Sequence, residues 1–306
     1  MADQVQDIRK LIRQHKLRDH AFALLGLVCM MVAVLILLGL FINLAIDGAS
    51  RLTPDFFTSF PSRHAERAGI LSAWVGTTLV MLVTLIAAVP VGISAAIYLE
   101  EYARKNWITD LIEVNVTNLA GVPSIVYGLL ALGLFVYQFG FGQSILSAGL
   151  TLALLVLPVI IVATREALRA VPRNIREAAY ALGATRWQMI QDHLLPYSFG
   201  GIMTGVIIGM ARAIGETAPL ITIGALSYIA FLPPSPVTET APYVNFEWLT
   251  SAFTVLPIQM FNWVSRPEAA FLKNAAATGA VIIVMTLLMN GTAIYLRYQI
   301  RKKIKW

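Results

Sequence analysis

Charged residues are scarce in this 306-residue sequence, at 13% of the chain, against about 25% in an ordinary water-soluble domain. Hydrophobic residues make up 58% of it. The charges that are present lie in short stretches between long apolar runs, as they must in a bilayer, because a charge in hydrocarbon costs several kcal/mol. This scarcity excludes a soluble core and predicts an all-α polytopic membrane protein.

Cysteine is nearly absent. The only one, Cys29, lies inside the first apolar run, so the chain has no disulfide framework and no thiol pair for redox or metal chemistry. There is no His-Glu-x-x-His motif, and all four histidines fall outside the predicted spans. An intramembrane hydrolase needs a nucleophile and a base within reach of each other. We therefore expect neither catalytic residues nor a metal site.

A phosphate-binding loop is also missing. The Gly-x-x-x-x-Gly-Lys-Ser/Thr pattern needs a lysine directly after a glycine, and none of the seven lysines follows one. We expect that the chain is not an enzyme and has no cofactor of its own. If ATP drives it, another protein must bind the nucleotide.

Six apolar stretches are each long enough to cross the hydrocarbon as a helix, which takes about 20 residues. They are predicted at residues 21–46, 71–99, 117–139, 144–164, 198–223 and 275–296. Pro90, Pro158 and Pro219 are expected to kink their helices. The sequence thus predicts about six transmembrane helices in one membrane domain.

Basic residues predict the orientation, because segments rich in lysine and arginine stay on the cytoplasmic side. They precede the first span and follow the last, at Arg9, Lys10, Arg13, Lys16, Arg18, Arg297, Arg301, Lys302, Lys303 and Lys305. Both termini are therefore expected in the cytoplasm. We predict a basic arm at residues 1–20, a membrane domain at residues 21–296 and a basic tail at residues 297–306. Membrane lipid, and not nucleic acid, is the expected counter-charge.

Two long connections, at residues 47–70 and 224–274, are expected on the outer side. The second is rich in proline and aromatic residues. Such a composition is typical of the outer boundary between water and lipid, and it suits a docking surface equally.

The cytoplasmic segment at residues 172–193 is predicted to form two short helices joined at Gly183. Pro172 suits a first helical position, and Gly183 can adopt the left-handed conformation that ends a helix. Thr185 and Gln188 can form a capping box that opens the second helix.

The surface of this helical hairpin suits a partner protein. Small side chains at Ala178 and Ala179 let another surface approach closely. Arg176, Glu177 and Arg186 supply charges that can orient it. The alternative is an ordinary hairpin at the membrane interface.

Arg212 and Glu216 lie within the fifth apolar stretch, and their spacing of four residues places them on one face of a helix. Counting from Tyr197, Arg212 is expected roughly 22 Å above the cytoplasmic end. Such side chains rarely face lipid. Glu216 offsets part of the arginine charge and leaves guanidinium donors for an oxyanion, and phosphate fits that fork. The alternative is a buried structural ion pair that locks helices together.

The third apolar stretch offers hydroxyl groups. Ser124 and Tyr127 lie near one face of a helix, and Pro123 frees a backbone carbonyl. Gly121 and Gly128 let helices approach each other. These residues fit a polar path through the membrane, and they fit helix packing as well.

Four stretches of the sequence resemble the permease subunits of phosphate-uptake ABC importers. Glu177-Ala-Ala followed by Gly183 and Leu195-Pro resembles the EAA loop, which seats on an ATPase subunit. Residues 211–219, Ala-Arg-Ala-Ile-Gly-Glu-Thr-Ala-Pro, look like the signature of those permeases, and Thr217-Ala-Pro looks like that of the A-type subunit. Residues 88–102 and 119–128 match the same family, so the resemblance covers most of residues 70–296.

The resemblance implies a type I-like ABC-importer permease fold with cytoplasmic coupling helices, in a prokaryotic plasma (inner) membrane. It implies a homologous C-type permease, two copies of an ATP-binding subunit that hold ATP and Mg²⁺, and an extracytoplasmic phosphate-binding protein. The expected substrate-path residues are Ser124, Tyr127, Arg212, Glu216 and Thr217, and the expected coupling residues are Arg176, Glu177, Ala178, Ala179, Gly183 and Arg186. An ABC permease for another oxyanion and an ion-coupled secondary transporter remain as alternatives.

Overall fold

The computed structural model describes residues 2–237 and 243–303. Most of these residues are helical, and their only strand-like pairing is one isolated bridge between Val237 and Val244. The helices are α1 (Ala2–Gly48), α2 (Pro54–Thr58), α3 (Leu71–Ile97), α4 (Trp107–Leu119), α5 (Ser124–Ala131), α6 (Ile145–Arg169), α7 (Arg173–Ala181), α8 (Arg186–Gln188), α9 (Leu195–Ile214), α10 (Ala218–Thr222), α11 (Leu256–Val264) and α12 (Ala270–Lys303). Lys305 of the expected basic tail and residues 238–242 of the second long connection lie outside the described residues.

The number of membrane crossings agrees with the sequence. Within the described chain, five helices are long and apolar enough to cross a bilayer, and α4 with α5 forms a sixth crossing if the bent pair counts as one span. The prediction of an all-α polytopic protein with about six transmembrane helices is confirmed.

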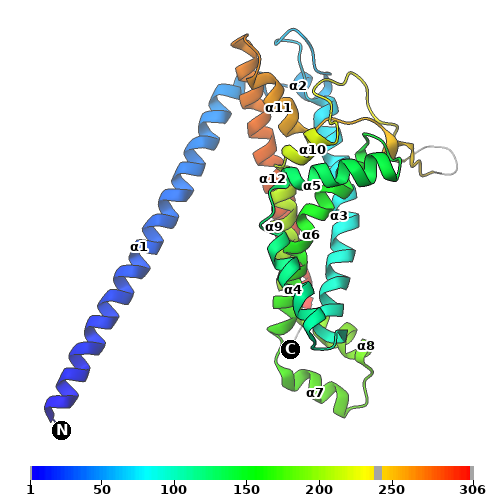
Figure 1. The fold of residues 1–306 in the computed structure, drawn as a ribbon. Helices are drawn as coiled ribbons and strands as arrows, with labels where there is room; N and C mark the ends of the chain where they lie inside the picture. Colours follow the sequence, from blue (N-terminus) through cyan, green and yellow to red (C-terminus); the bar gives the residue numbers. More distant parts are fainter. Residues whose placement is uncertain (1, 238–242, 304–306) are drawn as a thin grey trace.

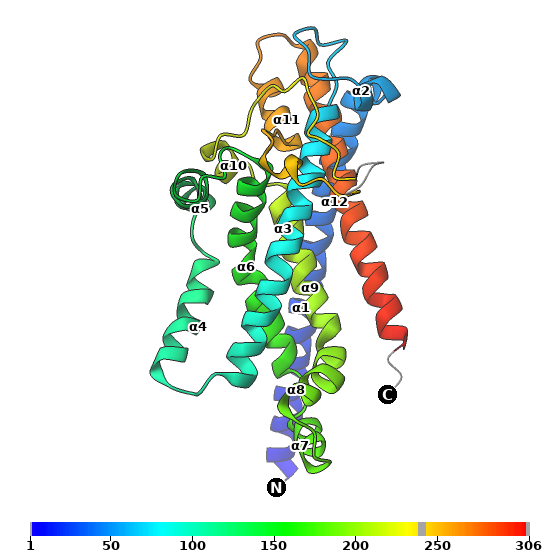
Figure 2. The same ribbon diagram turned by 90° about the vertical axis from the view of Figure 1, so that its right-hand side faces the viewer.

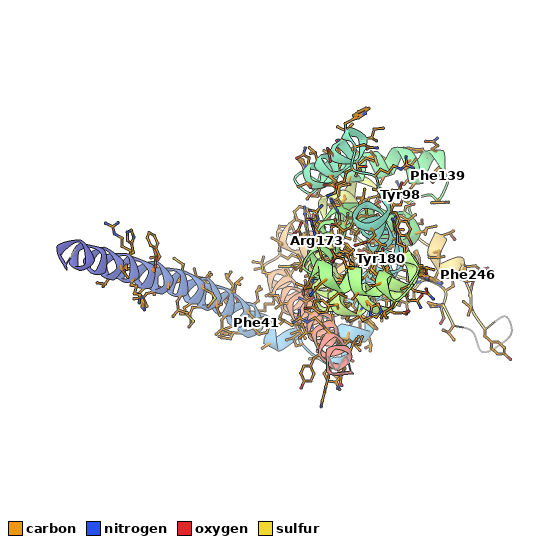
Figure 3. All side chains as sticks on the ribbon, turned by 90° about the horizontal axis from the view of Figure 1, so that it is seen from below. Phe41, Tyr98, Phe139, Arg173, Tyr180 and Phe246 are labelled. Carbon is orange, nitrogen blue, oxygen red and sulfur yellow. The ribbon has the colours of Figure 1, made fainter. Side chains whose placement is uncertain are left out.

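Helices α3, α6, α9 and α12 run side by side as a bundle (Figures 1 and 2). The C-terminal end of the first helix, α1, contacts α12. Toward its N-terminus α1 diverges from the bundle, and Figure 3 shows it projecting away beyond Phe41. Between residues 15 and 40 its apolar side chains are exposed on all sides, as in a span that faces lipid or another chain. The N-terminal end of α1 and the C-terminal end of α12 lie at the same end of the molecule as α7 and α8 (Figure 1).

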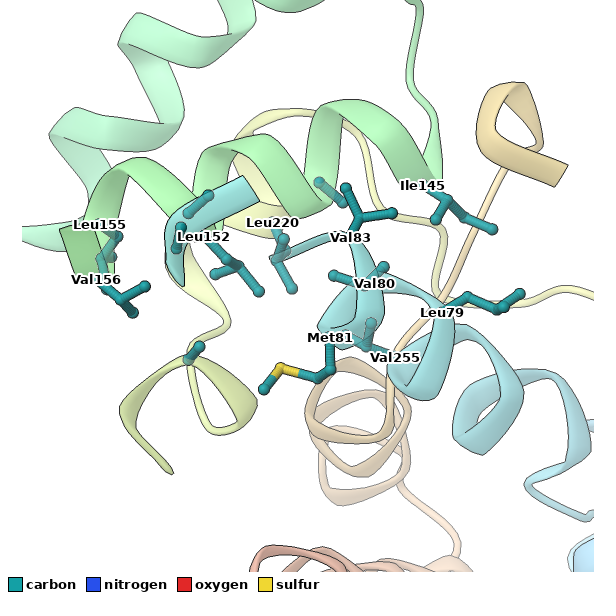
Figure 4. Close-up of a cluster of buried hydrophobic side chains, with 14 of the residues drawn as sticks. Leu79, Val80, Met81, Val83, Ile145, Leu152, Leu155, Val156, Leu220 and Val255 are labelled. Carbon is teal, nitrogen blue, oxygen red and sulfur yellow. The ribbon is translucent and has the colours of Figure 1, made fainter. Parts of the chain in front are cut away.

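The main apolar core lies between α3 and α6 (Figure 4). Small residues let these two helices approach closely, which is the usual means of packing helices in lipid. A Cβ added at Gly92 would lie 2.7 Å from Cγ2 of Ile160. The Thr84 hydroxyl donates a hydrogen bond across the interface to the Gly149 carbonyl at 3.2 Å. The α3–α6 pair therefore forms the rigid part of the bundle.

The prediction of a single third span at residues 117–139 is wrong. Helix α4 already begins at Trp107, after the Asn106 side chain accepts a hydrogen bond from the Thr109 amide at 2.9 Å. The chain then breaks at residues 120–123, and α5 leaves at 108° to α4. Pro123 causes the break, because it has no N–H and stands in an extended conformation with ψ 135°. Figure 2 shows α4 along the bundle and α5 end-on.

The fifth span also differs from the prediction of residues 198–223. Helix α9 ends at Ile214, and Pro219 opens the separate short helix α10 instead of kinking a longer one. At the other end, α8, a π-helical stretch called η4 (Met189–Leu194) and α9 form one continuous helix from Arg186 to Ile214. The second short helix expected after Gly183 is therefore the beginning of this span. Pro90 and Pro158 lie inside α3 and α6, which continue past them.

Candidate functional site

Arg212 and Glu216 meet at the point where α9 ends. The Arg212 Nε donates a hydrogen bond to Oε1 of Glu216 over 3.4 Å. The sequence predicted that the helix continues through Glu216, but α9 ends at Ile214. Instead, the Gly215 and Glu216 amides donate to the carbonyls of Arg212 and Ala213 at 3.3 and 3.2 Å. This tight turn folds the carboxylate back over the guanidinium.

The pair is only partly enclosed by its own chain. The Arg212 side chain is 37% exposed and that of Glu216 is 20% exposed. Glu216 contacts only Nε, so both Nη groups of Arg212 have no ion-pair or hydrogen-bond partner among the described residues. An arginine with an open fork of this kind can still take an oxyanion.

Tyr127 of α5 lies within electrostatic reach of Arg212, although the two residues belong to different spans. Close packing of α5 on α10 brings them together, because a Cβ added at Gly128 would lie 2.6 Å from Cα of Pro219. The Tyr127 hydroxyl donates at 2.8 Å to the carbonyl of Leu119, the last residue of α4. Tyr127 thus links the α4–α5 bend to the neighbourhood of Arg212.

Ser124 and Thr217 are the other expected path residues. Ser124 is the first residue of α5 and Thr217 directly precedes α10, and both are half-buried. Within the described parts of the chain their hydroxyls make no hydrogen bond. They remain available to a ligand or a second protein.

At the opposite end of the span, α7 packs on a small apolar core formed by Ile97, Leu168, Val171, Met189, Ile190 and Leu194. Ala179 belongs to this core and is buried, so it cannot admit a partner surface as the sequence had suggested. Ala178 and Glu177 beside it are exposed.

Arg176 also points into its own chain. Its guanidinium binds the Glu101 carboxylate through Nε and Nη2 at 3.2 and 3.0 Å. It further donates to the carbonyls of Val171 and Leu168 at 2.7 and 2.8 Å. Arg176 therefore fixes α7 to the end of α6 and to the end of the α3 span, and its guanidinium is occupied by its own chain.

The turn after α7 forms as predicted. Gly183 has a φ of +83°, and the amides of Gly183 and Ala184 donate to the carbonyls of Tyr180 and Ala179. These two bonds are those of a Schellman C-cap. The capping box of Thr185 and Gln188 is present as well. Pro172 stands one residue earlier than predicted, at the N-cap of α7.

Two large apolar side chains on this surface were missed by the sequence reasoning. Leu182 is 89% exposed and Trp187 is 55% exposed, on either side of Gly183. Exposed apolar groups clustered at a turn are typical of a protein interface. Arg186, between them in sequence, stacks on the Tyr102 ring at 5.3 Å. The signal was present in the sequence, as a leucine and a tryptophan beside a helix-ending glycine.

A group of four charges between α4 and α6 was missed too. Glu100 and Glu113 alternate with Arg165 and Arg169, which lie in α6. Nothing in the sequence pattern pairs Glu113 with Arg165, because 52 positions separate them.

Residues 88–305 match the family described as the binding-protein-dependent transport system inner membrane component. The chain belongs to this family. The permease, as we now call it, is 31% identical to a probable ABC transporter permease protein, YqgI, of Bacillus subtilis, over 90% of this chain and 94% of that protein.

Other relatives have names that state a substrate. The permease is 35% identical to the phosphate transport system permease protein PstA of Mycobacterium leprae, over 74% of this chain and 70% of that protein. It is 30% identical to PstA of Yersinia pestis, over 92% of this chain and 90% of that protein.

A solved structure has the same fold. The MetNI methionine ABC transporter in an inward-facing conformation matches with a TM-score of 0.55 at 16% identity, over 76% of this chain and 94% of that chain. The expected fold of an ABC-importer permease is confirmed. The permease is a multi-pass membrane protein of the inner-membrane component family.

We predict that Gly183→Ala loosens the 172–193 segment, because a left-handed conformation costs a residue with a Cβ about 1–2 kcal/mol. Limited trypsin digestion of the purified protein should cleave faster at Arg173, Arg176 or Arg186. Gly183→Asn is the control, since asparagine tolerates this conformation and should digest more like the parent. Equal digestion of all three proteins would contradict the assigned turn.

Proposed function

We propose that the permease imports inorganic phosphate as one half of the translocation path of an ATP-driven importer. The observation that carries the proposal is the open guanidinium of Arg212 beside Glu216, at the end of a membrane-crossing helix. The relatives named as phosphate transport permeases support the choice of solute. Residues 211–219, which include Arg212, support it from the sequence, because they resemble the signature of phosphate-uptake permeases.

The local electrostatics suit a passing oxyanion. Two Nη groups on one planar fork match two phosphate oxygens, which makes a bidentate charge-assisted contact. Glu216 neutralises part of the charge through Nε, so the anion is bound and also released, as conduction requires. The exposed part of Arg212 would face a homologous C-type permease, which completes the path. Tyr127, Ser124 and Thr217 would contribute hydroxyl groups to it.

The energy would come from a partner, because no phosphate-binding loop occurs in the sequence. We place the docking surface on the exposed side of the 172–193 segment, at Glu177, Ala178, Leu182, Gly183 and Arg186. Two copies of an ATP-binding subunit, carrying ATP and Mg²⁺, would dock there and on the second permease. The permease itself catalyses no reaction.

The orientation follows from this arrangement. The basic N-terminal end of α1 and the basic C-terminal end of α12 would lie in the cytoplasm together with α7, because Figure 1 shows them at the same end of the molecule. The connections 47–70 and 224–274 would then form the outer mouth, where an extracytoplasmic phosphate-binding protein delivers its ligand.

We predict that Arg212→Ala lowers phosphate uptake by about 100-fold, because two hydrogen bonds to a charged ligand are lost. Uptake of radiolabelled phosphate into proteoliposomes, together with the amount of assembled complex, measures the effect. Arg297→Ala is the matched control, since Arg297 only donates to the Thr204 hydroxyl at 2.8 Å and should keep most uptake. An Arg212→Ala complex that fails to assemble would favour a structural ion pair over a substrate contact.

ATP dependence separates this proposal from an ion-coupled transporter. We expect phosphate uptake to stop when ATP is depleted, even with the proton gradient kept intact. Uptake that persists under those conditions would overturn the proposal. Competition by other oxyanions in the same assay tests the choice of phosphate.

We predict that Leu182→Glu weakens binding of the ATP-binding subunit by about tenfold or more, because a charge replaces an exposed apolar contact at an interface. Copurification of the subunit with the permease measures this binding. Leu17→Glu is the control, because Leu17 is also an exposed leucine, in the basic arm before the first span. Equal loss in both variants would remove Leu182 from the docking surface.

A further inference from the structure

Helix α4 is held to the bundle in an unusual way. None of its residues is buried, and apolar side chains such as Trp107 and Leu111 are exposed. Its C-terminal end leads into the break at residues 120–123. A cavity of about 380 Å³ lies between α4 and α6, and Val114 and Val162 line it from the two sides. Little apolar packing therefore fixes the angle of α4.

Ion pairs, and not apolar packing, attach α4 to the bundle. Arg165 Nη2 contacts Oε1 of Glu113, and Arg169 Nη2 lies 3.7 Å from Oε2 of the same carboxylate. On the other side, Oε2 of Glu100 lies 2.8 Å from Arg169 Nε and 3.6 Å from Arg165 Nε. Glu113 is the member of this group that belongs to α4, so the group connects α4 to α6 and to the end of the α3 span.

We propose that these four residues form an ionic latch that closes the cytoplasmic side of the permease by clamping α4 against α6. The proposal rests on the function proposed above, in which a partner ATPase moves the 172–193 segment. When the latch opens, α4 swings about residues 120–123.

The energetics suit a contact that must open. The Arg165 side chain is only 6% exposed, and its Nε and Nη2 make ionic contacts without the alignment of hydrogen bonds. Its partners Glu100 and Glu113 are 18% and 30% exposed, so opening hydrates these carboxylates and offsets part of the cost of breaking the buried pairs. The closed and open states can then lie close in free energy.

The latch is a poor binding site for the transported anion. Glu166 also pairs with Arg169, at 3.4 Å, so three carboxylates face two guanidiniums. A phosphate would have to displace these carboxylates from guanidiniums that they already pair with. We therefore assign the cluster a closing role, and the anion contact remains at Arg212.

The latch is connected to the segment where the ATPase would dock. Glu100 and Glu101 are neighbours in η2 (Tyr98–Tyr102), the π-helical turn that ends the α3 span. Glu100 is part of the latch through its ion pair with Arg169. Oε1 of Glu101 lies 3.0 Å from Nη2 of Arg176 in α7. A displacement of α7 therefore pulls on the turn that carries one of the latch carboxylates.

The latch is connected to the substrate path at its other end. The last residue of α4, Leu119, accepts the hydrogen bond of Tyr127, and Tyr127 lies within electrostatic reach of Arg212. A swing of α4 thus changes the surroundings of the anion contact. A series of contacts therefore runs from α7 through the latch to Tyr127, which lies within electrostatic reach of Arg212.

Charge reversal in the assembled complex tests the latch. Glu113→Arg and Arg165→Glu each place like charges in contact, and the double variant restores the attraction with the signs exchanged. We expect each single variant to lower phosphate transported per ATP hydrolysed by about tenfold or more, because a broken buried pair costs several kcal/mol. The double variant should recover only part of this loss, because the new arginine at position 113 faces Arg169 and the new glutamate at position 165 faces Glu100. Asp110→Asn is the control and should leave the ratio unchanged, because Asp110 is an exposed carboxylate of α4 that makes no ion pair within the described chain.

A second measurement does not depend on the solute. In a Cys29→Ala background, which removes the only cysteine, Val162→Cys places a thiol under α4. A water-soluble maleimide should label it several-fold faster when Glu113→Gln or Glu113→Arg is added, and at an intermediate rate in the double variant with Arg165→Glu. Glu113→Gln keeps the side-chain shape and serves if a reversed variant fails to assemble.

The outcomes are distinct. Unchanged labelling in every assembled Glu113 variant, or a double variant no better than the single ones, overturns the latch. A parent complex without ATP-driven phosphate uptake overturns the proposed function, while the labelling result still decides whether α4 is clamped by charge.

Discussion

A charge placed in hydrocarbon costs several kcal/mol unless it is paired or hydrated, and this cost determines where the arginines of the permease lie. Arg212 stands where a helix ends, beside a carboxylate that the following turn folds back over it. Arg165 is buried, and two carboxylates from different helices face it. The ion pairs of Arg165 therefore also connect α6 to α4 and to the end of the α3 span. The pair of Arg212 and Glu216 connects the end of α9 to the turn that follows it.

The apolar spans and the turn at Gly183 were predictable because their causes are local. About 20 apolar residues suffice to identify a crossing helix, and a glycine followed by a capping box suffices to end one helix and start another. The proximity of Arg212 and Glu216 was also predictable, since four residues separate them. Local rules were enough wherever the interacting residues are neighbours in sequence.

Contacts between distant segments were not predictable in the same way. Pro123 interrupts the helix, but the sequence does not say by what angle, and the bend of 108° depends on the packing of α5 on α10. Arg176 and Ala179 looked available to a partner, because the sequence does not say that Glu101 and the small core under α7 face them. The latch residues come from three separate segments, so no single motif contains them.

The continuous helix from Arg186 to Ile214 has a mechanical consequence. Its 29 residues span roughly 40 Å, with the turn at Gly183, the proposed docking surface, next to one end and Arg212 near the other. A stiff rod of that length acts as a lever arm, so a tilt of about 5° around its base shifts the far end by roughly 3 Å. Such a shift exceeds the tolerance of a bidentate contact. Binding and release of an anion would then require no unfolding of this helix and no change in its internal conformation.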